Sequence, residues 1–129
     1  MRLLIDTHVF FWLIAAPEKI SSTALSALTP ETNQLLVSAA TPWEMSIKRQ
    51  AGKWPEAEPI LTGYAALLNR LTAVELPIRA AHGIAAGQLT WDHKDPFDRL
   101  LAAQAMIESV RLVSADSVFD TLPEFRRLW

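Results

Sequence analysis

Short apolar runs alternate along this chain with longer segments in which apolar residues return roughly every three to four positions. The runs have the length of buried strands and cover residues 2–5, 35–37, 73–76 and 111–113. Segments with helical spacing separate them. This alternation predicts an α/β fold with a mainly parallel central sheet flanked by helices.

Prolines, a glycine and capping residues mark where the predicted helices begin and end. Thr41 has the place of an N-cap, with Pro42 at the first helical position and Glu44 at the third, which is a capping-box pattern. This helix reaches about residue 50, where Gly52 stops it. The other predicted helices cover about 10–16, 22–28, 56–70, 77–86 and 96–109.

Composition limits the class of protein. The chain has 129 residues, which fits one domain over residues 1–129 with a sizeable core. It has no cysteine, which excludes disulfide frameworks and cysteine zinc sites. The net charge of −2 argues against a polybasic nucleic-acid or membrane binder, although a cluster of metal-bound carboxylates would distort that count.

The N-terminal apolar run imitates a secretory signal, but Asp6 and His8 interrupt it and oppose insertion into a membrane. No other run approaches the roughly 18 apolar residues of a membrane span. We therefore expect a cytoplasmic protein. Its mean hydropathy of +0.15 is high and suggests that a second subunit or a partner covers apolar surface, as in a homodimer.

Four acidic residues fall at comparable places relative to the predicted strands. Asp6 and Asp116 directly follow the first and last strands, whereas Glu44 and Asp98 lie in the first turns of helices. Ligands of parallel sheets bind beyond the carboxyl ends of the strands, so these acids are expected to meet there. Clustered carboxylates need a compensating cation, and with no His or Cys at an equivalent position the oxygen donors favour Mg²⁺ or Mn²⁺.

Each of these acids also has an ordinary structural interpretation. Glu44 and Lys48 form an i, i+4 pair, which is common on helix surfaces. Asp98 fits the third position of a helix capped by Asp95, where the helix dipole favours a negative charge. Asp6 and Asp116 fit strand-end and turn positions.

Several motifs of this chain occur together in a known family. They are Leu4-Ile5-Asp6-Thr7-His8 with Trp12, Trp43-Glu44 with Lys48 and Gly52-Lys53, His93-Lys94-Asp95-Pro96-Phe97-Asp98-Arg99 with Ala103-Gln104-Ala105, and Val113-Ser114-Ala115-Asp116. In this order and spacing they resemble the PIN-domain ribonucleases, and among them the VapC toxins of bacterial type II toxin-antitoxin systems. The resemblance spans nearly the whole chain.

This resemblance implies a PIN fold and a Mg²⁺- or Mn²⁺-dependent endoribonuclease that a cognate VapB-like antitoxin inhibits. It places the catalytic and metal-binding acids at Asp6, Glu44, Asp98 and Asp116, with Asp120 as the alternative for the fourth. The expected reaction is hydrolysis of an RNA phosphodiester by a metal-activated water. Ser114 stands where relatives often have Thr, and Thr41-Pro42 departs from the usual Ser-containing run.

Other residues near these acids have two interpretations each. His8 and His93 are either RNA contacts or structural residues, and Thr7 either orients Asp6 or caps the next helix. Arg99 anchors its helix or holds a phosphate, with anchoring favoured. The aromatic residues Trp12, Trp43 and Phe97 are expected in the core or an interface. Basic residues that could contact an RNA backbone are Lys48, Arg49, Lys53, Lys94 and Arg99.

Other functions fit less well. A phosphatase with Asp6 as nucleophile would have a second aspartate where His8 stands, and no phosphate-binding loop of the P-loop type occurs. A catalytically inactive PIN-like module that binds RNA or protein remains the alternative. His82 shows no functional context in the sequence.

Overall fold

A computed structural model describes residues 1–129 and contains a four-stranded sheet in the order β3-β2-β1-β4. The strands are β1 (Arg2–Ile5), β2 (Gln34–Ser38), β3 (Ala73–Leu76) and β4 (Arg111–Val113). All three pairings are parallel, with β1 hydrogen-bonded between β2 and β4. The predicted α/β class, the parallel sheet and the four strand positions are confirmed.

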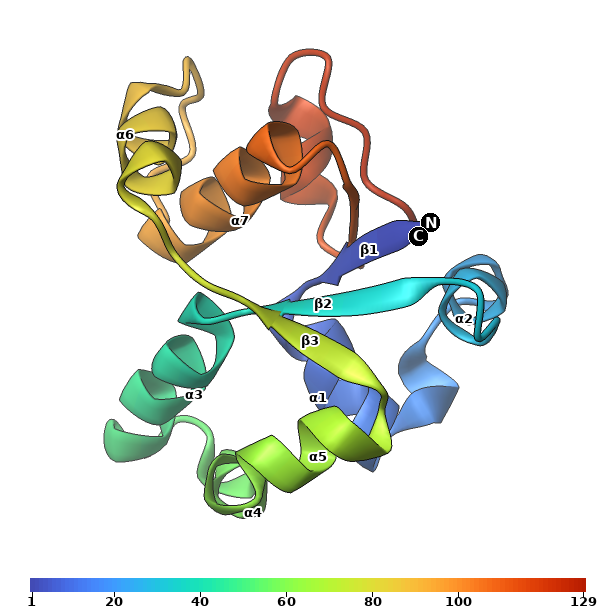
Figure 1. Cartoon of the computed structure of the whole chain (residues 1–129). Coiled ribbons are helices and arrows are strands. Elements are labelled where there is room, and N and C mark those ends of the chain that lie inside the picture. The colour runs from blue at the N-terminus through green and yellow to red at the C-terminus, as the bar shows by residue number, and fades with distance from the viewer.

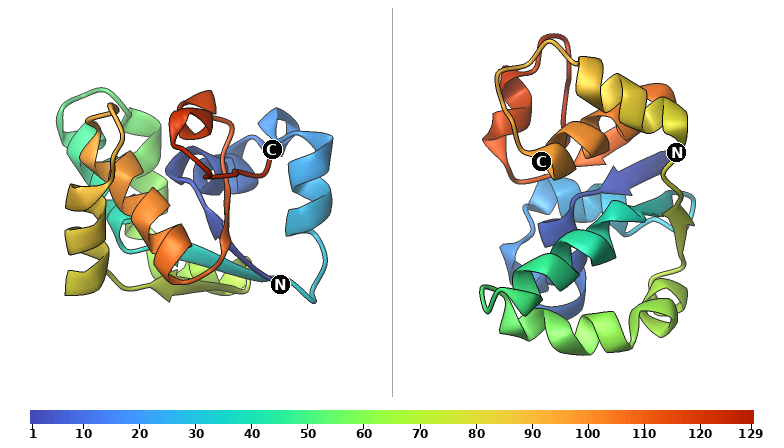
Figure 2. Two further views of the ribbon diagram at one scale, coloured as in Figure 1. Left: turned by 90° about the horizontal axis from the view of Figure 1, so that it is seen from above. Right: turned by 90° about the vertical axis from the view of Figure 1, so that its left-hand side faces the viewer.

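Helices cover both faces of this sheet (Figure 1). The α-helices are α1 (Thr7–Ala15), α2 (Ser22–Leu28), α3 (Ala40–Gln50), α4 (Glu58–Thr62), α5 (Tyr64–Arg70), α6 (Ala80–Gln88) and α7 (Pro96–Ile107), and η1 (Pro17–Lys19), η2 (Pro55–Ala57) and η3 (Ser117–Thr121) are 3₁₀ turns. Figure 2 shows the layers from the side, with α6 and α7 across the sheet from α3, α4 and α5. None of these helices has the length and apolar character needed to span a membrane.

The alternation of side chains along β1 divides the core into two parts. Leu3 and Ile5 pack into the larger cluster, together with Val9 and Phe10 of α1. Leu4 points to the opposite face and joins a cluster that includes Leu101 of α7. Because successive strand residues face opposite sides, a fully apolar strand buries both faces of the sheet.

The order of the strands creates a crevice at the carboxyl end of β1. The chain continues from β1 to β2 on one side, whereas β4 returns on the other side of β1. The residues after β1 form α1 in one core cluster, and Phe119 in the segment after β4 packs into the other. Segments that leave neighbouring strands toward opposite faces leave a crevice between them, which is where parallel sheets bind ligands.

The predicted capping box of the third helix is wrong. α3 begins at Ala40, and its N-cap Ala39 makes no side-chain cap, so Thr41 and Pro42 lie inside the first turn. Ser38 supplies the polar contact instead, because its Oγ accepts a hydrogen bond from the backbone N of Ala40 at 3.1 Å. The Thr41 side chain is therefore buried inside the first turn, and it does not cap the helix as its residue type would favour.

Two other predicted helices begin or continue differently. α6 begins at Ala80 and not at Pro77, and the ring of His82 accepts a hydrogen bond from the backbone N of Arg79 at 3.0 Å. The segment predicted as one helix over 56–70 is divided into η2, α4 and α5, with Gly63 between the last two. Apolar spacing continues through this break, which is why the pattern did not reveal it.

Candidate acidic active site

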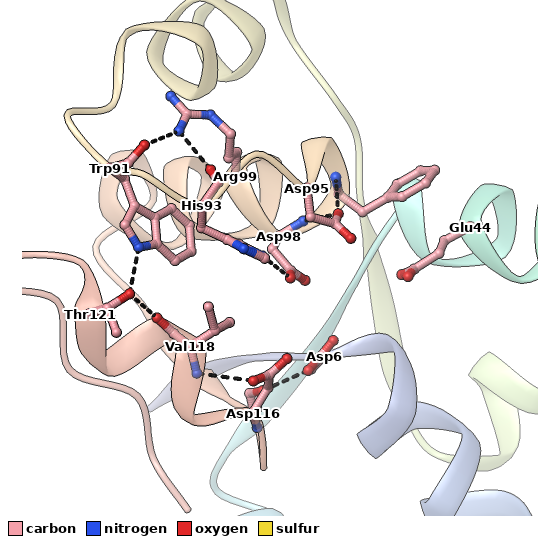
Figure 3. A network of polar contacts seen from close by, with 12 residues as sticks. Asp6, Glu44, Trp91, His93, Asp95, Asp98, Arg99, Asp116, Val118 and Thr121 are labelled. Carbon is pink, nitrogen blue, oxygen red and sulfur yellow. Dashed lines mark hydrogen bonds and ion pairs between the residues drawn. The ribbon is translucent and has the colours of Figure 1, made fainter.

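The carboxyl ends of the strands open into an acidic cleft of about 260 Å³. Its lining residues are Asp6, His8, Trp12, Glu44, Lys48, Asp95, Asp98, Ala115 and Asp116. Figure 3 shows the carboxylates of Asp6, Glu44, Asp98 and Asp116 turned toward one space from four different segments of the chain. The structure thus brings together the four acids that the sequence selected.

Asp6 is the most deeply held of these acids, with 7% of its surface exposed. Its Oδ1 accepts a hydrogen bond from the backbone N of Thr7 at 2.6 Å, and its Oδ2 accepts one from the Ser114 hydroxyl at 2.6 Å. Burial raises the pKa of Asp6, while the hydrogen bond from Ser114 works in the opposite direction. A nearby positive charge would therefore stabilise the ionised form of this buried carboxylate.

Asp98 lies in the first turn of α7 and is joined to a histidine. His93 Nε2 lies 2.7 Å from Asp98 Oδ2. Burial raises the pKa of Asp98 to about 6, the hydrogen bond with His93 lowers it, and the charges of Asp95 and Asp6 raise it further. His93 thus accompanies Asp98, although no histidine stands at a strand-end position equivalent to those of the acids.

Asp95 has the role that its position predicts. Its Oδ1 accepts hydrogen bonds from the backbone N of Phe97 at 2.9 Å and of Asp98 at 3.1 Å, which caps α7. The cap fixes the first turn of the helix and with it the position of Asp98. His93, Asp95 and Asp98 each place one potential metal-ligand atom so that these three atoms lie within 4.8 Å of one another.

Glu44 forms its predicted ion pair and also lies in the cleft. Its Oε2 accepts from Lys48 Nζ at 2.7 Å, as the i, i+4 spacing predicts. Unlike an ordinary surface pair, the Glu44 side chain is buried and lines the cleft. Lys48 also lines the cleft, so one cation stands among five carboxylates there.

The fourth acid in the cleft is Asp116 rather than Asp120. Asp116 is exposed, lines the cleft, and accepts a hydrogen bond from the backbone N of Val118 at 3.0 Å. Its own backbone N donates to Ser114 Oγ at 3.0 Å, so this serine is hydrogen-bonded both to Asp6 and to the Asp116 backbone. Asp120 is bound instead by Arg127 Nε and Nη2, each at 3.0 Å.

Two buried threonines connect α1 to α3 beside the cleft. The hydroxyl oxygens of Thr7 and Thr41 are 3.2 Å apart, and both residues are 1% exposed. Asp6 and not Thr7 is the N-cap of α1, because the Asp6 carboxylate accepts from the Thr7 backbone. The threonine pair fixes the relative position of the helices that carry His8 and Glu44.

Arg99 anchors the loop that carries His93, which confirms the favoured interpretation. Its guanidinium donates to the carbonyls of Ala86, Leu89, Trp91 and His93 at 2.8–3.0 Å. These bonds occupy most of the donors of the side chain, which favours anchoring over a phosphate contact. The indole Nε1 of Trp91 donates to Thr121 Oγ1 at 2.8 Å and fastens the same loop to η3 (Figure 3).

The remaining basic and aromatic candidates divide by position. Arg49 pairs with Glu58, and Lys94 lines a separate apolar hollow next to Trp43 and Phe97. Trp43 is 57% exposed and therefore does not lie in the core, which leaves the interface as its predicted place, and its ring meets Phe97 edge-on at 5.0 Å. An interface role for this aromatic pair stays a prediction.

Two cleft residues, His8 and Asp95, are not among the acids that the sequence assigns to the site. Sequence patterns leave His8 as a lone histidine and Asp95 as a helix cap. Both lie within two or three residues of a selected acid, His8 after Asp6 and Asp95 before Asp98. That proximity is the signal that could have identified them. His82, by contrast, is buried and hydrogen-bonded to Glu108 at 3.2 Å, away from the cleft.

The donors of the cleft are suited to a divalent cation. Carboxylate oxygens predominate, two of the carboxylates are held where burial raises their pKa, and one neutralising lysine is present. A cation with a preference for oxygen ligands would offset this concentration of negative charge.

Comparisons with known proteins agree on one family. The PIN domain matches residues 3–124. Ribonuclease VapC22 of Mycobacterium tuberculosis is 30% identical over 114 residues, which make up 88% of this chain and 85% of that protein. A solved structure of VapBC2 from Rickettsia felis bound to a promoter DNA fragment contains a similar fold, with a TM-score of 0.71, 18% identity and 100% of both chains covered.

Proposed function

This chain belongs to the PIN-domain family as a VapC-type member, and from that premise we propose that it is a toxin with metal-dependent endoribonuclease activity. It hydrolyses RNA phosphodiester bonds at the acidic cleft. The single observation that carries the proposal is the convergence of Asp6, Glu44, Asp98 and Asp116 on one space. A cluster of this kind is compatible with folding when a cation accompanies it.

The metal ligands in this proposal are Asp6, Glu44, Asp98 and Asp116, with Mg²⁺ or Mn²⁺ as the ion. Once bound, the cation supplies positive charge for the phosphate oxygens and lowers the pKa of water at the site. Ser114 and the Thr7 backbone orient the Asp6 carboxylate. His93 Nε2 is hydrogen-bonded to Asp98 Oδ2 and orients that carboxylate.

The reaction itself adds water across one P–O bond. Water attacks phosphorus opposite the leaving oxygen, and the cleft residues hold the phosphate in place for this attack. Lys48 Nζ, beside Glu44, supplies a positive charge of the chain itself at the entrance to the cleft. A carboxylate oxygen of the cleft accepts a hydrogen bond from the attacking water.

We further propose a VapB-like antitoxin as partner and a homodimer as the assembled form. The similar fold in the VapBC2 structure supports the first partner. Exposed apolar side chains support an additional interface, among them Trp43, Ile47 and Ile84. A cationic side chain of the antitoxin placed in the cleft would replace the charge of the metal. One domain over residues 1–129 and a cytoplasmic location remain predictions.

Cleavage of single-stranded RNA by purified, antitoxin-free protein tests this function. The protein is stripped of metal and assayed with Mg²⁺, with Mn²⁺ and without either ion. We expect cleavage only with a divalent cation, and loss of cleavage when the adjacently encoded small protein is added in excess. Absence of any metal-dependent cleavage, with RNA binding retained, would instead establish a binding module.

A further inference from the structure

A second hollow adjoins the acidic cleft and differs from it in charge. It is lined by His8, Phe11, Trp12, Lys19, Lys48, Lys53 and Trp54, and it shares His8, Trp12 and Lys48 with the cleft. Three lysines line this basic hollow, and no carboxylate does. A ligand that occupies both spaces therefore passes directly from an acidic region to a basic one.

His8 forms the boundary between the two spaces and is held as a flat platform. Its ring stacks on Trp54 with 4.9 Å between centroids and 16° between planes. Trp54 is 9% exposed and packs against Phe11 at 5.2 Å, so the ring behind His8 is fixed in the core. The imidazole itself is exposed. One face of His8 is thus supported from behind, and an exposed aromatic ring held in this way can receive another flat ring.

The position of His8 places this platform beside the acids. It occupies the second position of α1, two residues after Asp6. Trp12 follows one helical turn later, with its ring centroid 6.0 Å from that of His8. The N-terminal half of α1 therefore carries an aromatic surface that begins at the buried carboxylate.

The lysines complete the basic hollow around this aromatic surface. Lys48 Nζ contacts Glu44 at 2.7 Å and lies 5.8 Å from the centre of the Trp54 ring, so its charge lies between the two spaces. Lys53 follows Gly52, whose φ of 74° requires glycine for the turn that ends α3. Lys19 comes from η1 on the other side of the hollow.

We propose that this basic hollow binds the nucleotide next to the phosphate that is cut, with its base stacked on His8 and its own phosphate near Lys48 and Lys53. A nucleotide combines a flat aromatic ring with a negative phosphate, which matches an aromatic platform surrounded by lysines. The inference rests on the proposed function and adds a substrate subsite to it. The three lysines favour a nucleic acid over a peptide as the occupant, because an apolar peptide segment gains nothing from three clustered cations.

RNA binding tests the platform independently of catalysis. A fluorescent single-stranded RNA is titrated with Mg²⁺ present into Asp98→Asn, which is expected not to cleave, and into the same protein with His8→Ala or His8→Phe. We expect His8→Ala to weaken binding roughly tenfold and His8→Phe to retain most of the affinity, since a phenyl ring preserves the stacking face. A control exchange of an exposed apolar residue outside both spaces, Met106→Ala, is expected to leave affinity unchanged.

Two further measurements distinguish a stacked base from a purely electrostatic contact or a bound peptide. With the wild-type cleft, His8→Ala should raise KM with little change in kcat, and an RNA with one abasic position at the subsite should lose the difference between His8→Ala and wild type. Equal loss of affinity in His8→Ala and His8→Phe would show that charge and not stacking acts there, and would overturn the platform. Retained RNA affinity together with lost antitoxin inhibition in His8→Ala would also overturn it, by assigning the hollow to a peptide.

The outcomes also distinguish this inference from the proposed function. Metal-dependent cleavage with an unchanged KM in His8→Ala contradicts only the subsite. Absence of RNA binding and cleavage by the wild-type protein contradicts both. Thermal unfolding of each variant confirms that the exposed ring of His8 is replaced without loss of the fold.

Discussion

The two sides of the acidic cleft hold their carboxylates by different means. On the side of the sheet, Asp6 follows a buried central strand and is fixed by the Ser114 hydroxyl from the neighbouring strand end. On the side of α7, Asp98 follows an irregular loop that depends on Arg99 and on the Asp95 cap. The first arrangement comes from the regular hydrogen bonding of the sheet, and the second from side chains that replace it. Substitutions that remove the supporting side chains should therefore lower mainly stability on the side of α7 and mainly activity on the side of the sheet.

The largest expected effect is on catalysis, through Asp98→Asn. We expect RNA cleavage to fall at least about 100-fold and metal affinity to weaken, because the amide keeps the shape but carries no charge. Without metal, the free energy of unfolding should stay the same or rise, since the exchange removes a desolvated charge near Asp95 and Asp6. Single-turnover cleavage and thermal melts with and without Mg²⁺ measure both effects.

Asp95→Ala is the matched control within the same motif. It removes the acceptor for two backbone N–H groups and should lower the free energy of unfolding by about 0.5–2 kcal/mol, with residual activity per folded molecule. If Asp95→Ala were inactive but fully stable, Asp95 would be the acid of the site and Asp98 the structural residue. Near wild-type cleavage by Asp98→Asn would refute the assignment of the site.

The next largest effect is on stability, through Arg99→Ala. The exchange leaves four backbone carbonyls without their donor and should lower the free energy of unfolding by about 3 kcal/mol. Activity should fall as well, because the loop bearing His93 loses its anchor. Urea unfolding and cleavage assays measure these changes.

Arg99→Lys separates charge from geometry at this position. Lysine keeps the charge but cannot present the planar fork of donors, so we expect only partial recovery of stability. Full recovery would show that the positive charge alone holds the loop.

On the sheet side, Ser114→Ala should affect activity more than stability. The buried sheet remains, but Asp6 loses a donor that favours its ionised form, so metal affinity or kcat should fall about 10- to 100-fold. Ser114→Thr keeps the hydroxyl and should retain activity. Mg²⁺ titrations followed by cleavage distinguish the variants, and unchanged metal affinity and rate in Ser114→Ala would contradict this role.

The smallest expected effect is the pH dependence of stability without metal. The pKa of Asp98 is raised from 3.8 to about 6 in the folded protein, so the folded state holds its proton where the unfolded chain has lost it. The contribution of Asp98 to stability is therefore fully present below about pH 3.8 and is lost as pH rises through about 6. Melting temperatures over this range should decline less in Asp98→Asn than in wild type, and added Mg²⁺ should stabilise most at the upper end. Parallel profiles for the two proteins would contradict the shifted pKa.

The contrast between the two sides also explains what could be predicted. Strand runs in the sequence located the ends of β1 and β4, and parallel pairing then brings Asp6 and Asp116 near each other. The Asp95 cap was equally predictable, because capping depends on neighbours in the sequence. The motif resemblance selected the same acids and added the family.

The remaining features depend on contacts between distant segments. His93 reaches Asp98 only because Arg99 folds the loop back on itself, and no periodicity encodes that course. Thr41 fails as a cap because its hydroxyl meets Thr7, 34 positions earlier. The stack of His8 on Trp54 likewise joins segments 46 residues apart in sequence, as their numbers show.

The hydrogen bond between Asp6 and Ser114 joins residues 108 positions apart, and this separation determines when the cleft exists during protein synthesis. Ser114 is itself placed by the last residues of the chain, since its backbone N donates to Leu128 and its carbonyl accepts from Arg127 at 2.9 Å. A ribosome-bound chain that has not yet released these residues holds Asp6 without its partner strand β4. Synthesis proceeds from the N-terminus at about 5–20 residues per second, so the cleft is assembled only after residues 114–128 have left the ribosome. A cleft built in this order is incomplete for as long as that segment is still being made.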